Sequence, residues 1–132
     1  MATINKIEDL LVWQKSRGLV KQIFSITSKD TFNKEFFLKD QLKRSAISVM
    51  SNIAEGYGRG GNKEFIHFLY IANGSINELK SQLYISVDFN LITDADIEGS
   101  LFLLTEIELM IKSLAKKLKE SDYAGAKFKT QV

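Results

Sequence analysis

The sequence predicts an all-α protein, an antiparallel up-down-up-down four-helix bundle that assembles into oligomers. Four segments repeat apolar residues at the three- and four-residue spacing of an amphipathic helix, and none alternates as a strand would. The links between the segments are short, which makes successive helices antiparallel neighbours. No proline interrupts them. The 132 residues, 45% of them apolar, fit a single domain over residues 1–132 with a substantial core.

Composition and charge narrow the possible chemistry. The chain has no cysteine, which excludes disulfides and thiolate metal sites. Its formal net charge is only +2, so any affinity for nucleic acid must come from local clustering of basic residues. No charged and then apolar leader opens the chain, and no uninterrupted apolar run reaches the roughly 18 residues of a membrane span. We therefore expect a soluble cytoplasmic protein of bacterial type.

The first two helices are predicted from their apolar stripes. The first is expected over residues 10–26, where Asp9 can cap its start. The second is expected over residues 39–54, after a short turn that holds Phe36 and Phe37.

The third and longest helix is expected over residues 63–89. Asn62 is a plausible cap for its first turn. Asn90 suits the left-handed conformation that ends many helices.

The fourth helix is expected over residues 94–119. Thr93 and Asp96 have the spacing of an approximate capping box at its start. The lysine-rich residues 120–132 are expected to form a flexible basic tail.

Helices three and four each have a second apolar row beside the main one. A monomeric bundle needs about one stripe per helix, so an extra row predicts a second buried contact, and self-association is the simplest. Scattered surface leucines are the alternative, and we favour the oligomer. The extra rows consist of Ile66, Tyr70, Ile71 and Ile85 on the third helix and Leu103, Ile107, Met110 and Leu114 on the fourth.

Residues 41–59, QLKRSAISVMSNIAEGYGR, mix polar groups into an otherwise apolar helix. Buried polar groups need partners, so this segment predicts a polar interface or a polyanion site. It ends in the glycine-rich turn from Gly56 to Lys63, which nearly matches a phosphate-binding loop. The match fails because Asn62 displaces the lysine by one position and because a helix precedes the turn in place of a strand.

This turn has two possible roles. Its glycines let backbone N–H groups approach an anion, Arg59 and Lys63 add charge, and a helix N-terminus follows. Alternatively, it is a tight helix–helix connection that needs positive φ angles. The candidate phosphate contacts are Lys43, Arg44, Arg59 and Lys63.

Gly74 and Ser75 stand in the middle of the third helix, where a glycine costs about 1 kcal/mol in helix propensity. Small residues there let another helix approach closely. Glu78 falls on the face of Gly74 and can meet Arg44 or Arg59, within the chain or across a subunit contact. For Arg44, Glu55 and Glu78 we favour structural pairing over a ligand role.

No credible catalytic or metal site is present. Glu64 and His67 form one Glu-x-x-His motif, but a di-iron bundle needs two such motifs and this chain has one histidine. One histidine and no cysteine also exclude most nucleophile–base pairs. We therefore expect no enzyme activity, no metal and no cofactor.

Several segments resemble the bacterial four helix bundle protein family, also called the 23S rRNA intervening-sequence protein family. The segments are LLVWQKS (residues 10–16), DQLKRSAISVMSNIAEGYGR (residues 40–59), EFIHFLYIANGSINEL (residues 64–79) and SQLYIS (residues 81–86). The resemblance spans nearly the whole chain. The accessory variability protein of diversity-generating retroelements looks similar; it is a basic barrel that binds nucleic acid and reverse transcriptase.

The resemblance implies a bundle that assembles into a ring of five, with no catalysis attached. Some relatives are encoded inside intervening sequences of large-subunit rRNA genes. The residues that match the family's signature positions are Gln41, Arg44, Asn52, Glu55, Gly56, Arg59, Gly74, Ser75 and Glu78.

The leading hypothesis is a non-enzymatic homo-oligomer, a pentamer by resemblance, that binds RNA or DNA through the four basic residues above. The polar signature residues would then stabilise the bundle or its subunit interface. The alternative is a structural or adaptor oligomer that binds a protein partner and no nucleic acid. Salt-dependent retention on RNA distinguishes the two.

Overall fold

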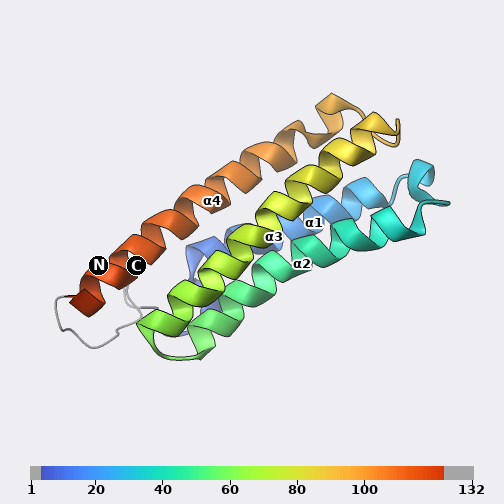
Figure 1. Ribbon diagram of the computed structural model, residues 1–132. Coiled ribbons are helices and arrows are strands. Elements are labelled where there is room, and N and C mark those ends of the chain that lie inside the picture. Colours follow the sequence, from blue (N-terminus) through green and yellow to red (C-terminus); the bar gives the residue numbers. More distant parts are fainter. Residues whose placement is uncertain (1–3, 124–132) are drawn as a thin grey trace.

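The computed structural model describes residues 4–123, which form four long helices and two short 3-10 turns (Figure 1). In chain order these are η1 (Ile7–Asp9), α1 (Leu11–Thr27), η2 (Asp30–Phe32), α2 (Phe36–Gly58), α3 (Asn62–Asp88) and α4 (Asp94–Tyr123). The described part contains no strand, so the predicted all-α four-helix bundle is confirmed. The expected tail lies outside the described residues from 124 onward, and its residues 120–123 belong to α4.

The helices pack around a single core. Packing is most extensive between α2 and α3, and α1 closes the bundle by contacting both α2 and α4. Large apolar side chains on the inward stripe of every helix are fully buried, among them Leu19, Leu42, Leu69 and Leu104. Figure 1 shows the resulting shape, an elongated bundle with the connections at its two ends. None of the helices in the described part is both long and apolar enough to cross a membrane.

The start of α2 differs from the prediction. Phe36 and Phe37 belong to the helix and not to a preceding turn, because the first helical hydrogen bond runs from the Lys39 N–H to the Glu35 carbonyl at 2.9 Å. The turn comes earlier, where the buried Phe32 anchors η2 in the core. The apolar pattern could not reveal these extra residues, because both phenylalanines are exposed and add nothing to the buried stripe.

Two predicted caps are also wrong. Asp9 lies in η1, and α1 starts after Leu10 without a side-chain cap. Asn62 is the first residue of α3 and its cap position is Gly61. The Asn62 side chain turns inward, where its Nδ2 donates a hydrogen bond of 2.9 Å to the Leu118 carbonyl. It therefore connects the start of α3 to the end of α4.

Two other predicted features of helix ends are confirmed. Asn90 has a φ of 61°, the left-handed conformation expected after α3. At α4, the Thr93 N–H donates to Asp96 Oδ2 at 2.8 Å and the Asp96 N–H donates to Thr93 Oγ1 at 3.2 Å, which completes the capping box. The hydrogen bond from the Thr93 N–H lowers the pKa of Asp96, and Lys29 contributes in the same direction.

This capping box predicts a pH-dependent contribution to stability. Because the pKa of Asp96 is lower in the folded protein, its contribution is complete above the ordinary aspartate pKa of about 3.9 and disappears as pH falls through the folded value. Asp96→Ala should therefore lower the melting temperature at neutral pH, and the difference from wild type should vanish in acid. Asp94→Ala is the control, since Asp94 lies in the same first turn without such a bond. An equal loss at both pH values would contradict the prediction.

Candidate nucleic-acid interface and assembly face

The polar residues of the second helix meet small polar residues of the third. Ser48 Oγ lies 2.8 Å from Ser75 Oγ, and Asn52 Nδ2 donates to the Ser48 carbonyl at 2.8 Å and to its Oγ at 3.0 Å. These bonds form a polar seam between α2 and α3. Because Ser48, Asn52 and the buried Ser75 satisfy one another, the seam needs no ligand to explain it.

Together with the α2 residues of this seam, further residues of both helices form one surface, which we call the α2–α3 face. Three- and four-residue spacing places them along the same side of each helix, and the Ser48–Ser75 contact joins the two rows. The face therefore contains most of the predicted interface residues. It consists of Gln41, Arg44, Ser48, Asn52 and Glu55 from α2 and Phe68, Ile71, Gly74, Glu78 and Ile85 from α3.

The two glycines next to this seam have different roles. A Cβ on Gly56 would lie 2.8 Å from the Phe68 Cβ and 3.0 Å from the Phe65 Cδ1, so this glycine lets α2 and α3 touch. A Cβ on Gly74 would meet no atom within 4 Å. Ser75, the next residue, contacts Ser48 of α2, and the single chain gives no packing reason for Gly74.

The glycine-rich connection is a helix–helix turn in which Gly60 alone has a positive φ, 81°. Gly56 and Gly58 belong to α2. Arg59 is held by carboxylates, at 2.9 Å from Glu55 and 3.9 Å from Glu64, and its guanidinium lies 5.0 Å from the ring centre of Phe68. Arg59 thus connects α2 to α3.

This arrangement makes the start of α3 less favourable for binding a phosphate. The carboxylate of Glu64 stands in the first turn, where the helix dipole favours negative charge, and it balances Arg59 as well. Lys63 is exposed and makes no ion pair within the described part of the chain. Of the two predicted phosphate contacts at this turn, Arg59 is paired with two carboxylates, whereas Lys63 has no carboxylate partner among the described residues.

The other two predicted basic residues lie elsewhere. Arg44 is paired with Asp40 at 2.7 Å, one turn earlier on α2, and the Lys43 amine lies 4.8 Å from the ring centre of Phe24 on α1. Fifteen residues of helix separate Arg44 from Arg59, which corresponds to about 22 Å. The four predicted residues therefore form two separate basic sites and not one cluster.

The aromatic residues next to Lys43, at the start of α2, were not predicted from the sequence as part of a site. A shallow hollow at the start of α2 is lined by Phe36, Phe37, Lys39, Asp40 and Lys43. The two rings are 74% and 79% exposed. Two consecutive phenylalanines next to lysines are the signal that could have revealed the site, but the prediction placed them in a turn.

Glu78 does not pair with Arg44 or Arg59 inside the chain. Both arginines bind other carboxylates, and Glu78 is exposed with no ion-pair partner in the described residues. Of the two arrangements considered for Glu78, the pair within the chain is therefore not formed, and a contact across subunits stays a prediction.

The second apolar rows are buried to different extents on the two helices. On α4, Ile107 and Leu114 are buried in the core, and Leu103 and Met110 pack against it. On α3, Tyr70, Ile71 and Ile85 are exposed, while Ile66 packs against the core. Of the two predicted rows, the one on α3 therefore leaves apolar side chains open for a second contact.

His67 shows no sign of metal binding. Its ring meets the ring of Phe68 edge-on, with centres 5.5 Å apart. Across the described residues, no three His, Asp or Glu side chains gather in a way that could hold a metal ion.

Comparisons with known proteins identify the family. A model of the 23S rRNA-intervening sequence protein family matches residues 8–113. A solved structure from Bacteroides thetaiotaomicron, described as a protein of unknown function from the S23 ribosomal protein family, is 28% identical with a TM-score of 0.72. The similarity covers 80% of this chain and 98% of that one. A search of curated proteins gives no match. Since the family model covers well over half of the sequence, the chain belongs to the 23S rRNA-intervening sequence protein family.

Proposed function

We propose that this protein is a non-enzymatic homo-oligomer that assembles through its α2–α3 face and binds RNA through lysines at the surface of α2 and at the α2–α3 turn. The observation that carries the assembly is Gly74. Its missing side chain faces open space at a cost of about 1 kcal/mol in helix propensity, and Ile71, one turn earlier, and Ile85, about three turns later, are exposed on the same side of α3. A helix of a second copy packed on this face would explain the glycine and cover both isoleucines.

RNA binding is proposed for lysines that have no carboxylate partner among residues 4–123. Lys39 and Lys43 line the hollow that also contains Phe36 and Phe37, and Lys63 is exposed at the α2–α3 turn. Cations next to exposed rings suit single-stranded nucleic acid, which offers phosphates and bases together. The family name associates relatives with rRNA. Repetition around an assembly raises the avidity of a weak patch.

The self-assembly proposal is tested by the mass in solution. Light scattering at micromolar concentration should give a multiple of the 15.0 kDa chain mass, with five copies expected from the family resemblance. The Glu78→Ala variant should have a lower mass at equal concentration, because Glu78 would face a partner subunit in the assembly. A cooperative unfolding transition together with a monomeric wild-type mass would remove the proposal.

The RNA-binding proposal is tested with two double variants of equal charge loss. Lys39→Ala with Lys43→Ala should weaken binding of unrelated single-stranded RNAs and flatten the salt dependence by about 0.7 per lost phosphate contact between about 50 mM and 200 mM salt. Arg59→Ala with Lys63→Ala should have a smaller effect, because two carboxylates already balance Arg59. Binding isotherms at several salt concentrations give both quantities.

The outcomes distinguish the possible sites. A larger loss from the Arg59 and Lys63 pair would place RNA at the glycine-rich turn. Wild-type protein that binds no RNA even in low salt would exclude the RNA function and favour an adaptor that binds a protein partner.

A further inference from the structure

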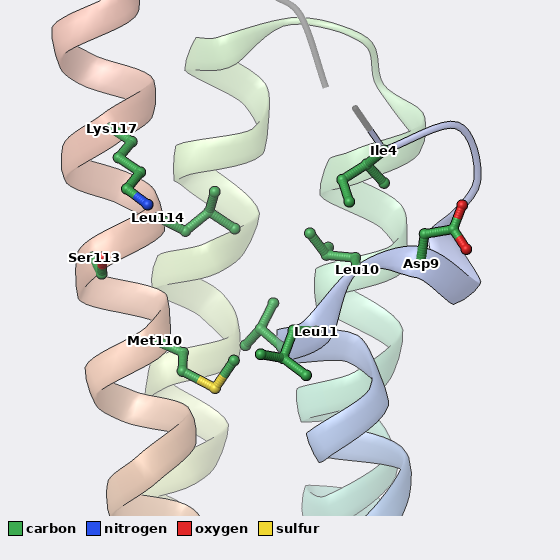
Figure 2. A pocket seen from close by; sticks show the side chains of 9 residues that line it. Ile4, Asp9, Leu10, Leu11, Met110, Ser113, Leu114 and Lys117 are labelled. Atoms are coloured by element: carbon green, nitrogen blue, oxygen red, sulfur yellow. The ribbon is translucent and has the colours of Figure 1, made fainter. Parts of the chain in front are cut away.

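A hollow at the α1–α4 edge of the bundle has no part in the proposed assembly or in RNA binding. An ion pair of 3.4 Å between Lys15 and Glu106 and a hydrogen bond of 2.8 Å between Ser100 and Gln22 set the register of α1 against α4. In this register the start of α1 at Leu11 lies across from Met110 (Figure 2). From there α4 continues to its end at Tyr123, about 20 Å further, without α1 beside it.

The segment before α1 lies opposite this part of α4 and does not close the space between them. The η1 turn and its flanking residues form one side of a hollow of about 390 Å³ and α4 forms the other (Figure 2). This volume is at the lower end of the range for small-molecule sites, about 300–1,000 Å³. The walls are mainly apolar and consist of Ile4, Leu10, Leu11, Val12, Met110 and Leu114.

Three polar residues complete the lining, namely Asp9, Ser113 and Lys117. Figure 2 shows the Lys117 amino group beside Leu114 on the α4 side, whereas the Asp9 carboxylate is turned outward on the far side of η1. Lys117 makes no ion pair with any described residue. The hollow thus combines apolar walls with a cation on the α4 side and a carboxylate on the η1 side that is turned away from it.

We propose that this hollow binds a small anionic amphiphile, a straight-chain carboxylate whose tail lies against the apolar walls and whose head pairs with Lys117. Apolar walls favour methylene groups and exclude an ion from the interior, so the charged head must remain at the rim. The ammonium at that rim selects a negative head group. Such binding does not depend on the proposed RNA binding or assembly, because the lining of the hollow comes from η1 with its flanking residues, α1 and α4.

The probe is decanoate, titrated into wild-type protein by isothermal calorimetry below its micelle concentration. We expect saturable binding, tighter than that of decanol or decylamine. Lys117→Met should weaken decanoate binding about fivefold, the upper range for an exposed ion pair, and leave decanol binding unchanged. Lys116→Met is the matched control: it removes a neighbouring lysine of the same helix that does not line the hollow, and it should bind decanoate like wild type.

A second variant tests the location independently of charge. Met110→Trp fills the hollow and should abolish decanoate binding, while the helical circular dichroism spectrum shows whether the bundle remains folded. Ser113→Phe narrows the same hollow from the surface. It replaces Met110→Trp in the experiment if that variant does not fold. Four results would each overturn the proposal: no binding by wild type, equal binding of decanol, tighter binding of decylamine, or undiminished decanoate binding in a folded, filled variant.

Discussion

Gly56→Ala should lower the free energy of unfolding by roughly 1–3 kcal/mol, the usual cost of forcing extra carbon into a packed interface. The added Cβ would lie 2.8 Å from the Phe68 Cβ, an atom fixed close to the backbone of α3. A flexible side-chain tip could move aside, but here the two helices must separate. This cost exceeds the gain of up to about 1 kcal/mol that alanine brings to a helix.

Gly58→Ala is the matched control for this substitution. Gly58 lies two residues later in the same helix, and a Cβ there would meet nothing within 4 Å. Its stability should equal or slightly exceed that of wild type. Urea unfolding followed by circular dichroism gives both values. If the two variants proved equally stable, the close α2–α3 contact at Gly56 would be refuted.

Gly74→Leu should reduce the mass of the assembly while each chain remains folded. Within a single chain the leucine side chain projects into open space from the middle of α3, and it improves helix propensity by almost 1 kcal/mol. If a second copy packs on the α2–α3 face, the same side chain occupies the space that the partner's helix needs. Chain stability and self-association should therefore change in opposite directions.

Gly99→Leu separates this effect from a general response to an exposed leucine. Gly99 also stands within a helix, α4, and also has open space where a Cβ would be. This variant should keep the wild-type mass. Light scattering at several concentrations measures the mass, and thermal unfolding measures the fold. An unchanged mass for Gly74→Leu would show that the α2–α3 face is not the subunit contact.

Short-range features of the structure were predictable because their partners are neighbours in the chain. The apolar periodicity identifies four helices since residues three or four apart share a helix face. The capping box depends on Thr93 and Asp96 alone, and the left-handed Asn90 depends on its own short side chain. In each case the interacting groups lie within one helical turn of each other.

Features that join different helices were decided by the tertiary structure. Ser48 reaches Ser75 and Asn62 reaches Leu118 only after the bundle has formed. Two glycines with similar sequence surroundings differ for the same reason: Gly56 lies against the rings of α3, and Gly74 faces open space. Sequence spacing assigns a residue to a helix face, but it does not say which other helix, if any, covers that face.

Charge pairing likewise depends partly on neighbours in the chain and partly on contacts between helices. The basic residues were visible in the sequence, and the pairs Arg44–Asp40 and Arg59–Glu55 both have i, i+4 spacing. Whether each cation was available for a ligand also depended on the packing of α2 against α3, which brings Glu64 and Phe68 to Arg59. By itself, the sequence determined the helices, their order and the family resemblance. Only the tertiary structure decided which faces remain open and which further groups surround a cation such as Arg59, because both depend on how one helix packs against another.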